Sequence, residues 1–343
     1  MVEHGGPVLV TGGSGFLAGH VILRLLAEGQ HVRTTVRSAR RQADVRATLH
    51  RAGADTGRLE FATADLSADG GWSAAVSGCE FVLHVASPFP NRQPKDENEV
   101  IQPAREGAVR VLRAAAGAHV RRVVMTSSFA AVGYSPKPSG LPYDETDWTD
   151  PSGPQSPYVK SKALAERDAW AFAAANAVEL TVINPVGIFG PVLGSDVAAS
   201  VQIIGGLLAG RPPVLPRASF AVVDVRDAAE LHVRALTEPR AAGERFLASS
   251  GQPVTLPEIA TMLRAGLGPA ARRVPTRELP DWTFRTAARV VPALRELAGL
   301  LGEPKRLSTA KATELLGWQP RPVADTMVAT AESLLDRTSV PRG

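Results

Sequence analysis

Short apolar runs alternate with amphipathic stretches through the first half of the chain. The apolar runs predict strands at residues 7–11, 31–36, 59–63, 81–85, 122–126 and 180–183. Between them, apolar residues at helical spacing predict helices at 15–28, 44–51, 97–116 and 158–175. A strand–helix alternation of this length predicts an α/β fold of the Rossmann type, a doubly wound parallel sheet with helices on both faces.

The pattern changes after residue 184, where Pro, Gly and Leu become frequent. A strand-like run at 220–223, a helix at 225–236 and a strand at 245–247 are expected to return to the sheet, whereas short helices are expected at 257–265, 282–298 and 309–316. We therefore expect a Rossmann domain made of residues 1–184 and 218–250. Residues 185–217 and 251–343 would form a second, smaller and mostly helical lobe that binds substrate.

Composition narrows the classes of function. The 343 residues include 44% hydrophobic and 21% charged residues, with a formal net charge of only +4, as in an ordinary globular protein. We see no basic stripe with interleaved aromatics, no apolar run long enough to span a bilayer, no signal peptide and no metal motif. Cys79 is the only cysteine, so no intrachain disulfide can form. We expect a cytoplasmic protein that binds neither nucleic acid nor membrane, as a monomer or homodimer.

A glycine-rich turn joins the first strand to the first helix. Gly12 permits a tight turn, and Gly15 lets the backbone approach a pyrophosphate without a Cβ in the way. Phe16 and Leu17 open the helix, whose unpaired N–H groups favour phosphate. The spacing is Gly-x-x-Gly-x-x-Ala, and it predicts a dinucleotide site; an ordinary glycine-rich turn is the alternative.

Basic residues follow the second strand, where NAD enzymes usually carry an acid for the ribose 2′-hydroxyl. Arg37 is our first choice to pair with the 2′-phosphate of NADPH, with Arg40 or Arg41 assisting. The alternative is a solvated basic helix face. After the third strand, Asp65-Leu66 offers a carboxylate that would accept a hydrogen bond from adenine or would cap a helix.

Tyr158 and Lys162 stand four residues apart at the start of a predicted helix, so they share one face. An ammonium and the nicotinamide cation would lower the pKa of the phenol, which could then protonate a carbonyl oxygen as hydride reaches the carbon. Ser128, at the carboxyl end of a strand, is our choice to hold that oxygen, and Ser127 is the fallback.

Taken together, these motifs resemble the extended short-chain dehydrogenase/reductase superfamily. The sequence is similar within it to the dihydroflavonol reductase, cinnamoyl-CoA reductase and yeast-type methylglyoxal (aldehyde) reductase group, through three runs: Val32-Arg33-Thr34-Thr35-Val36-Arg37, Val82-Leu83-His84-Val85-Ala86-Ser87-Pro88-Phe89 and Val222-Val223-Asp224-Val225-Arg226-Asp227. Leu315-Leu316-Gly317-Trp318-Gln319-Pro320 also fits. The resemblance implies an NADPH-dependent oxidoreductase that uses Ser128, Tyr158 and Lys162, with Val85, Ala86, Ser87, Pro185 and Gly187 along the cofactor crevice.

The resemblance leaves the substrate open. The stretch Ser156-Pro157-Tyr158-Val159-Lys160-Ser161-Lys162 lacks the cysteine of the cinnamoyl-CoA reductases, and no Asn or Asp between Phe129 and Tyr134 could hold a flavonoid hydroxyl. A small or apolar ketone or aldehyde fits better. Aromatics at Phe89, Phe129, Tyr134 and Phe189 suggest an apolar pocket or simply core packing, and His84 is expected to be structural.

Two other functions compete with carbonyl reduction. One is an NAD-dependent nucleotide-sugar epimerase or hydroxysteroid-type dehydrogenase, against which Arg37 counts. The other is a non-catalytic regulator that senses NADPH; such proteins commonly lose the Tyr or the Lys, and both are present here.

Overall fold

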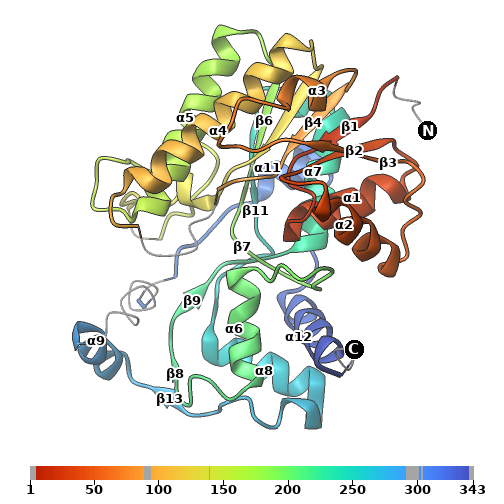
Figure 1. Ribbon diagram of the computed structural model, residues 1–343. Coiled ribbons are helices and arrows are strands. Elements are labelled where there is room, and N and C mark those ends of the chain that lie inside the picture. The colour runs from red at the N-terminus through yellow and green to blue at the C-terminus, as the bar shows by residue number, and fades with distance from the viewer. Residues whose placement is uncertain (1–4, 89–93, 139, 291–300, 303, 340–343) are drawn as a thin grey trace.

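A parallel sheet of seven strands forms the centre of the protein. The computed structural model describes residues 5–88, 94–138, 140–290, 301–302 and 304–339. The strand order is β11-β6-β5-β4-β1-β2-β3, and all six pairings are parallel (Figure 1). The strands are β1 (Val8–Val10), β2 (Val32–Val36), β3 (Leu59–Thr63), β4 (Phe81–His84), β5 (Arg122–Thr126), β6 (Leu180–Pro185) and β11 (Arg245–Ala248). The predicted Rossmann-type architecture is confirmed.

Helices cover both faces of this sheet. On one face α1 (Phe16–Ala27), α2 (Arg40–Arg51) and α7 (Val225–Thr237) share a buried apolar core with the strands. On the other face the core includes α3 (Trp72–Val76), α4 (Asn98–Gly117) and α5 (Pro157–Ala175). The sequence pattern missed the five-residue helix α3 and began α2 four residues late, so Arg41 belongs to a helix.

One predicted strand does not join the main sheet. The run at 220–223 divides into β9 (Ser219–Phe220) and β10 (Val222–Asp224). β10 pairs with β7 (Gly187–Phe189), and β9 pairs with β12 (Val254–Thr255), each in a separate two-stranded ladder. The apolar pattern predicted a strand correctly, but periodicity carries no information about the partner of a strand.

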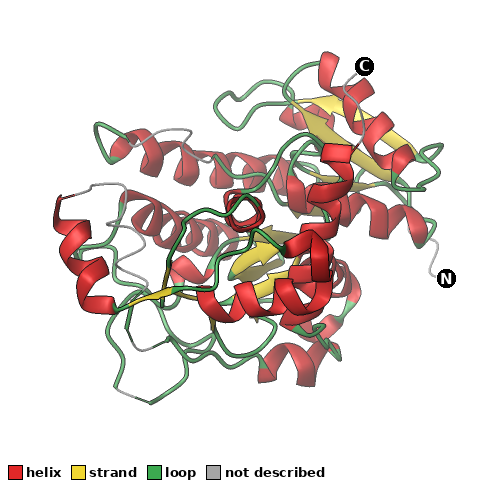
Figure 2. Ribbon diagram, turned by 90° about the horizontal axis from the view of Figure 1, so that it is seen from below, coloured by secondary structure: helices red, strands yellow, loops and turns green. Residues whose placement is uncertain are grey.

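A smaller, mostly helical group of elements lies below the sheet in Figure 1, and Figure 2 views the molecule from that side. Here α6 (Ala199–Leu208), α8 (Leu256–Leu267) and α12 (Val323–Ser339) pack around a third core. Beside it, β8 (Leu215–Pro216) pairs with β13 (Glu278–Leu279), and α9 (Asp281–Val290) follows. The sequence analysis predicted neither α6 nor α12, and residues 291–298 of its predicted helix lie outside the described residues.

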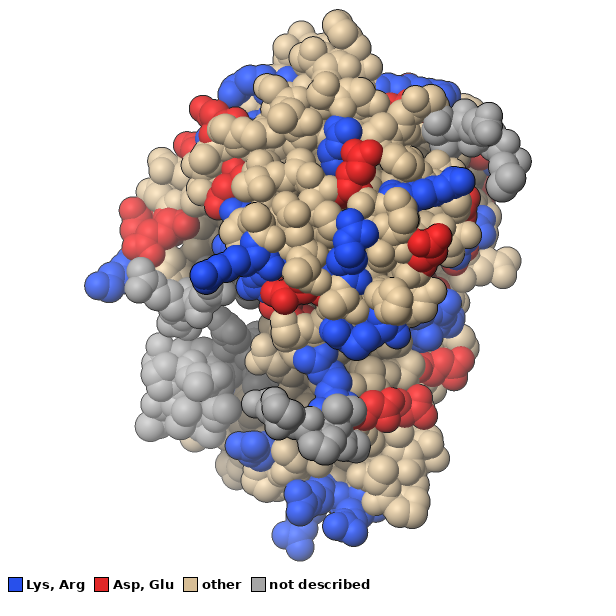
Figure 3. Space-filling model, turned by 45° about the vertical axis from the view of Figure 1, so that its right-hand side comes forward, with Lys and Arg blue, Asp and Glu red and all other residues tan. Residues whose placement is uncertain are grey.

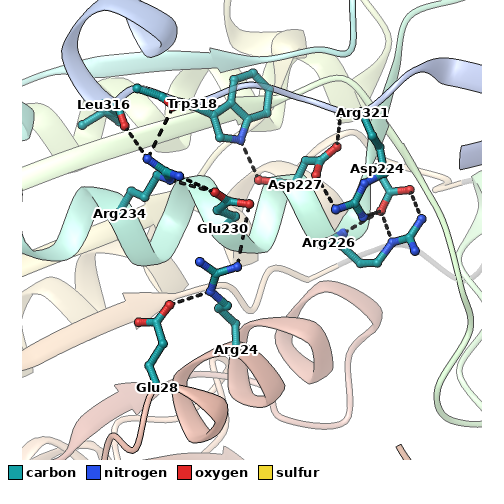
Figure 4. Close-up of polar contacts among 11 residues, drawn as sticks. Arg24, Glu28, Asp224, Arg226, Asp227, Glu230, Arg234, Leu316, Trp318 and Arg321 are labelled. Atoms are coloured by element: carbon teal, nitrogen blue, oxygen red, sulfur yellow. Dashed lines mark hydrogen bonds and ion pairs between the residues drawn. The ribbon is translucent and has the colours of Figure 1, made fainter. Parts of the chain in front are cut away.

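The segment around α11 (Ala310–Leu316) packs with the sheet rather than with the smaller lobe to which the sequence analysis assigned it. Ala312, Leu316 and the fully buried Trp318 belong to the core that contains α1 and α7. The Trp318 indole donates to the Asp227 carbonyl at 2.9 Å, and Arg321 pairs with the Asp227 carboxylate at 3.1 Å (Figure 4). These bonds fasten the C-terminal segment to α7.

Charges of both signs are interspersed over the face shown in Figure 3, with a group of basic side chains at its lower end. Across the described part of the chain, no helix combines the length and the apolar character that crossing a bilayer requires. No cluster of three or more His, Cys, Asp or Glu side chains suited to a metal occurs among the same residues.

Candidate active site

The glycine turn after β1 is packed too closely for side chains. Gly12 has a φ of +73°, and a Cβ there would lie 2.8 Å from the Ala86 Cβ. A Cβ at Gly13, which the sequence analysis did not single out, would lie 2.3 Å from the Thr34 Oγ1. Because Gly15 offers no capping side chain to α1, the N–H groups of the first helical turn stay available to an anion.

A surface cavity opens beside this turn, and basic residue Arg41 lines it. The Arg41 guanidinium lies 3.7 Å from the Asp196 carboxylate, which comes from the loop after β7. Phe16 is half-buried and lines the cavity, whereas the Leu17 side chain lies in the core, so only the backbone of Leu17 could face a ligand here. The lining residues are Gly13, Ser14, Gly15, Phe16, Gly19, Arg41, Asp44, Val45, Thr48, Leu49, Leu193, Gly194, Ser195 and Asp196.

Asp65 closes a turn just after β3. Its Oδ1 accepts hydrogen bonds from the Ser67 N–H at 2.9 Å and the Ser67 hydroxyl at 2.8 Å. These bonds lower the pKa of Asp65, and the nearby charge of exposed Arg37 adds to the effect. Asp65 is not the N-cap of α3, which begins after Gly71, so one of its two predicted roles is wrong. The other carboxylate oxygen, Oδ2, and Arg37 nearby could both contact a nucleotide. The predicted hydrogen bond between Asp65 and adenine therefore stays a prediction.

A second cavity lies where the carboxyl ends of β4 and β5 meet helix α5. Its lining brings Ser87 from the β4 end together with Lys162, and the Lys162 ammonium donates to the Ser87 hydroxyl at 2.8 Å. The lining residues are Leu66, His84, Ala86, Ser87, Pro88, Ala104, Ala108, Met125, Thr126, Ser127, Lys162, Ala165 and Glu166. In parallel sheets, ligands bind at this carboxyl edge.

Several residues expected along the crevice stand just outside these two cavities. Val85 packs against the core of the sheet. Pro185 is buried as the last residue of β6, and exposed Gly187 begins β7, where a Cβ would approach the Ala221 carbonyl to 3.1 Å. Phe89 lies outside the described residues.

Tyr158 lies in the first turn of α5 and bonds to Ser128. Helix α5 begins with Pro157 after Ser156, whose hydroxyl accepts from the Val159 N–H at 3.4 Å. Burial raises the pKa of Tyr158, and the hydrogen bond with the Ser128 side chain opposes that rise. The sequence analysis expected Lys162 and a bound nicotinamide cation to lower this pKa, and that stays a prediction; in the chain by itself, the loss of water around the phenol disfavours phenolate.

The two consecutive serines face different partners. The Ser127 hydroxyl donates to the Glu166 Oε2 at 2.5 Å, deep in the protein. The Ser128 hydroxyl accepts from the Ala130 N–H at 3.1 Å as the N-cap of a short 3₁₀ turn, and it also reaches Tyr158. The structure therefore brings Ser128, rather than the fallback Ser127, to the phenol.

Lys162 has a depressed pKa. Burial lowers the pKa of its ammonium to about 8, while the charge of Glu166 pulls it back upward. An amine that titrates in this range, one helical turn from Tyr158 on α5, is suited to assist proton transfer near neutral pH.

His84 is structural, as its place in a buried strand suggested. Its Nδ1 lies 3.0 Å from the Thr11 Oγ1, which accepts from the Ala86 N–H at 2.9 Å. Burial lowers the pKa of His84 to about 3, so the ring is neutral at physiological pH and joins the glycine turn to the β4 end.

Aromatic side chains gather beyond Tyr158. The Tyr134 ring is tilted 6.1 Å from Phe129, and the Lys305 ammonium sits 3.7 Å above Tyr134 while donating to the Gly133 carbonyl at 2.6 Å. Burial raises the pKa of Tyr134, and the proximity of Tyr158 adds to it. Phe189, by contrast, belongs to the core of the smaller lobe. Sequence reasoning missed Lys305, which lies far along the chain from the other residues.

Comparison with known proteins gives one consistent picture. A family model described as "NAD dependent epimerase/dehydratase family" matches residues 8–248. A cinnamoyl-CoA reductase of Medicago truncatula, named CAD2, is 36% identical over 249 residues, covering 71% of this chain and 76% of its own. An anthocyanidin reductase of Vitis vinifera is 32% identical over 287 residues, covering 79% and 82%.

Solved structures agree in fold. The yeast methylglyoxal/isovaleraldehyde reductase Gre2, complexed with NADPH, superimposes with a TM-score of 0.78 at 24% identity and covers 97% of this chain and 99% of its own. Vestitone reductase from alfalfa gives a TM-score of 0.75 at 26% identity, covering 98% and 100%.

Proposed function

This chain belongs to the NAD dependent epimerase/dehydratase family of extended short-chain dehydrogenases/reductases, and from that premise we propose that it is an NADPH-dependent carbonyl reductase. It would act as a ketoreductase, reducing a ketone or aldehyde to an alcohol. The observation that carries the proposal is the hydrogen bond between Tyr158 and Ser128 at the head of α5, one helical turn before Lys162.

The residues around the glycine turn fit a dinucleotide. Side chains at Gly12 and Gly13 would collide with their neighbours, so the backbone there is kept bare, and the first turn of α1 presents N–H groups. Arg37 and Arg41 supply guanidinium groups for a 2′-phosphate. When bound, NADPH supplies the hydride. The Gre2 neighbour was solved with NADPH, which supports this choice of cofactor.

The proton comes from the chain itself. The Ser128 hydroxyl holds the substrate oxygen beside Tyr158, and the phenol donates its proton to that oxygen as the carbon receives hydride, giving an alcohol. The pKa of Tyr158 is raised, so the phenol enters the reaction protonated, as an acid must. Lys162 places a positive charge nearby, which stabilises the phenolate left after transfer.

The test is NADPH oxidation, followed by loss of absorbance, with a panel of ketones and aldehydes. We expect turnover with at least one carbonyl, and we expect Tyr158→Phe to abolish it while NADPH binding stays near that of the parent chain. Full activity in that variant would remove Tyr158 as the acid.

Analysis of the bound cofactor and of NADPH binding, alongside this assay, separates the competing functions. Tightly bound NAD recovered from the purified protein would favour an epimerase, which oxidises and re-reduces its substrate in one cycle. Tight NADPH binding without turnover across the panel would favour a regulator.

A further inference from the structure

A fully buried carboxylate, that of Glu166, lies one helical turn beyond Lys162 on α5. Glu166 lines the same cavity as Lys162 and has no exposed surface. An ionised carboxylate out of water costs several kcal/mol unless charges and hydrogen bonds compensate it. The proposed proton transfer assigns no role to Glu166.

Arg245 compensates this charge from the far edge of the sheet. Its Nε donates to the Glu166 Oε1 at 2.6 Å, and its side chain is only 8% exposed. The carbonyls of Glu145 and Asp147 each accept from the Arg245 Nη1 at 2.9 Å, and the guanidinium stacks 3.7 Å above the Trp148 ring. Contacts other than Glu166 thus hold the guanidinium in place, and it gives the Glu166 carboxylate a charge-assisted hydrogen bond.

The other oxygen of Glu166 holds the serine pair. Oε2 accepts from the Ser127 hydroxyl at 2.5 Å and from the Asn184 amide at 2.7 Å. The same Asn184 amide donates to the Ser128 carbonyl at 3.1 Å. The bond to Glu166 therefore holds the Ser127 side chain, and the bond from Asn184 holds the Ser128 backbone. The Ser128 hydroxyl then meets Tyr158.

We propose that Glu166 is a positioning residue of the reductase, which aligns Ser128 with Tyr158 through Ser127 and Asn184. This rests on the function proposed above. The charge of Glu166 also raises the pKa of Lys162 against the effect of burial. A buried ion pair needs donors for its remaining carboxylate oxygen, and here those donors are Ser127 and Asn184, which respectively flank and bond the Ser128 backbone.

Few other charges face Lys162. His84 on β4 is neutral, and Tyr158 carries no charge before proton transfer. Helix α4 packs on α5 and carries Arg105, and Glu97 lies just before it. At the surface, Glu97 pairs with Lys160 at 2.8 Å and Arg105 with Asp168 at 2.5 Å. Removing the Glu166 charge should therefore act on Lys162 without replacement from a neighbour.

The test compares Glu166→Gln with Asp168→Asn, which removes an ion-paired carboxylate two residues away on α5. For Glu166→Gln we expect kcat to fall at least ~10-fold, because a misaligned acid loses much of its contribution. The alkaline fall of kcat should move to lower pH, because Lys162 loses the charge that raises its pKa. Asp168→Asn should leave both unchanged.

The double variant Glu166→Gln/Arg245→Met guards against simple misfolding. Removing both charges of a buried pair is often neutral for stability, so the Tm should recover. We expect kcat and the pH profile to stay altered. If both return to parental values along with the Tm, or if Glu166→Gln shows the parental kcat and pH profile, the positioning role is wrong. A parent chain that reduces no carbonyl would instead overturn the proposed function.

Discussion

Alkaline pH should switch off carbonyl reduction through Lys162. The phenol of Tyr158 has a raised pKa and so stays protonated well above neutrality. Lys162 changes state earlier, because burial places its pKa at about 8. With that value, roughly nine in ten lysines carry charge at pH 7 and roughly one in ten at pH 9.

The direction of the pH effect on kcat follows from the direction of the reaction. Reduction needs the ammonium to stabilise the phenolate that forms, so the rate should be highest below pH 8 and fall about tenfold between pH 7 and pH 9. The assay is kcat at saturating NADPH and carbonyl, at constant ionic strength, across this range.

Two variants make the assignment specific. Lys162→Met should lower kcat by about 10²-fold or more and remove the alkaline fall. Lys160→Gln is the matched control, since Lys160 is paired at the surface with Glu97. A rate that stays flat to pH 9 in the parent chain, or a fall that shifts in Lys160→Gln, would refute the reasoning.

Three further variants test other parts of the site. Arg37→Ala should weaken NADPH binding far more than NADH binding, measured by cofactor fluorescence; equal losses would disprove the contact with the 2′-phosphate. Ser128→Ala should lower kcat by about 10-fold or more, and Ser127→Ala by less; the reverse order would reassign the substrate oxygen to Ser127. Gly12→Ala should lower the free energy of unfolding by about 1–2 kcal/mol, because φ is +73° and the new Cβ would meet Ala86. Denaturant melts measure this change, and no change would mean that the turn relaxes freely.

Sequence alone predicted the sheet because each strand there is a short apolar run, and burial on both faces imposes that pattern. It predicted that Tyr158 and Lys162 lie on one helix because their spacing fixes which residues share a face. It failed for α12, whose threonines blur the apolar stripe, and it misplaced α11, because docking on α7 depends on Trp318 reaching Asp227 across 91 residues.

The hydrogen-bond network around Glu166 could not be predicted from the sequence for a related reason. The Lys162–Glu166 spacing is visible in the chain, but such i, i+4 pairs are common on helix surfaces. What distinguishes this one is burial and the arrival of Arg245, 79 residues further on. The raised pKa of Tyr158 was missed likewise, since desolvation is set by the fold and not by neighbours in the sequence.

The two consecutive serines have different chemical roles because their side chains point to opposite sides of the chain. Successive side chains at the end of an extended strand point to opposite sides. Ser127 therefore turns inward to Glu166, while Ser128 turns to Tyr158, and the Asn184 amide spans both by bonding Glu166 and the Ser128 carbonyl. A strand register shifted by one residue would exchange the two hydroxyls. The ladders of β5 with β4 and β6 set that register, and in the role proposed above the Glu166 carboxylate would keep Ser127 turned inward and so leave Ser128 to the phenol.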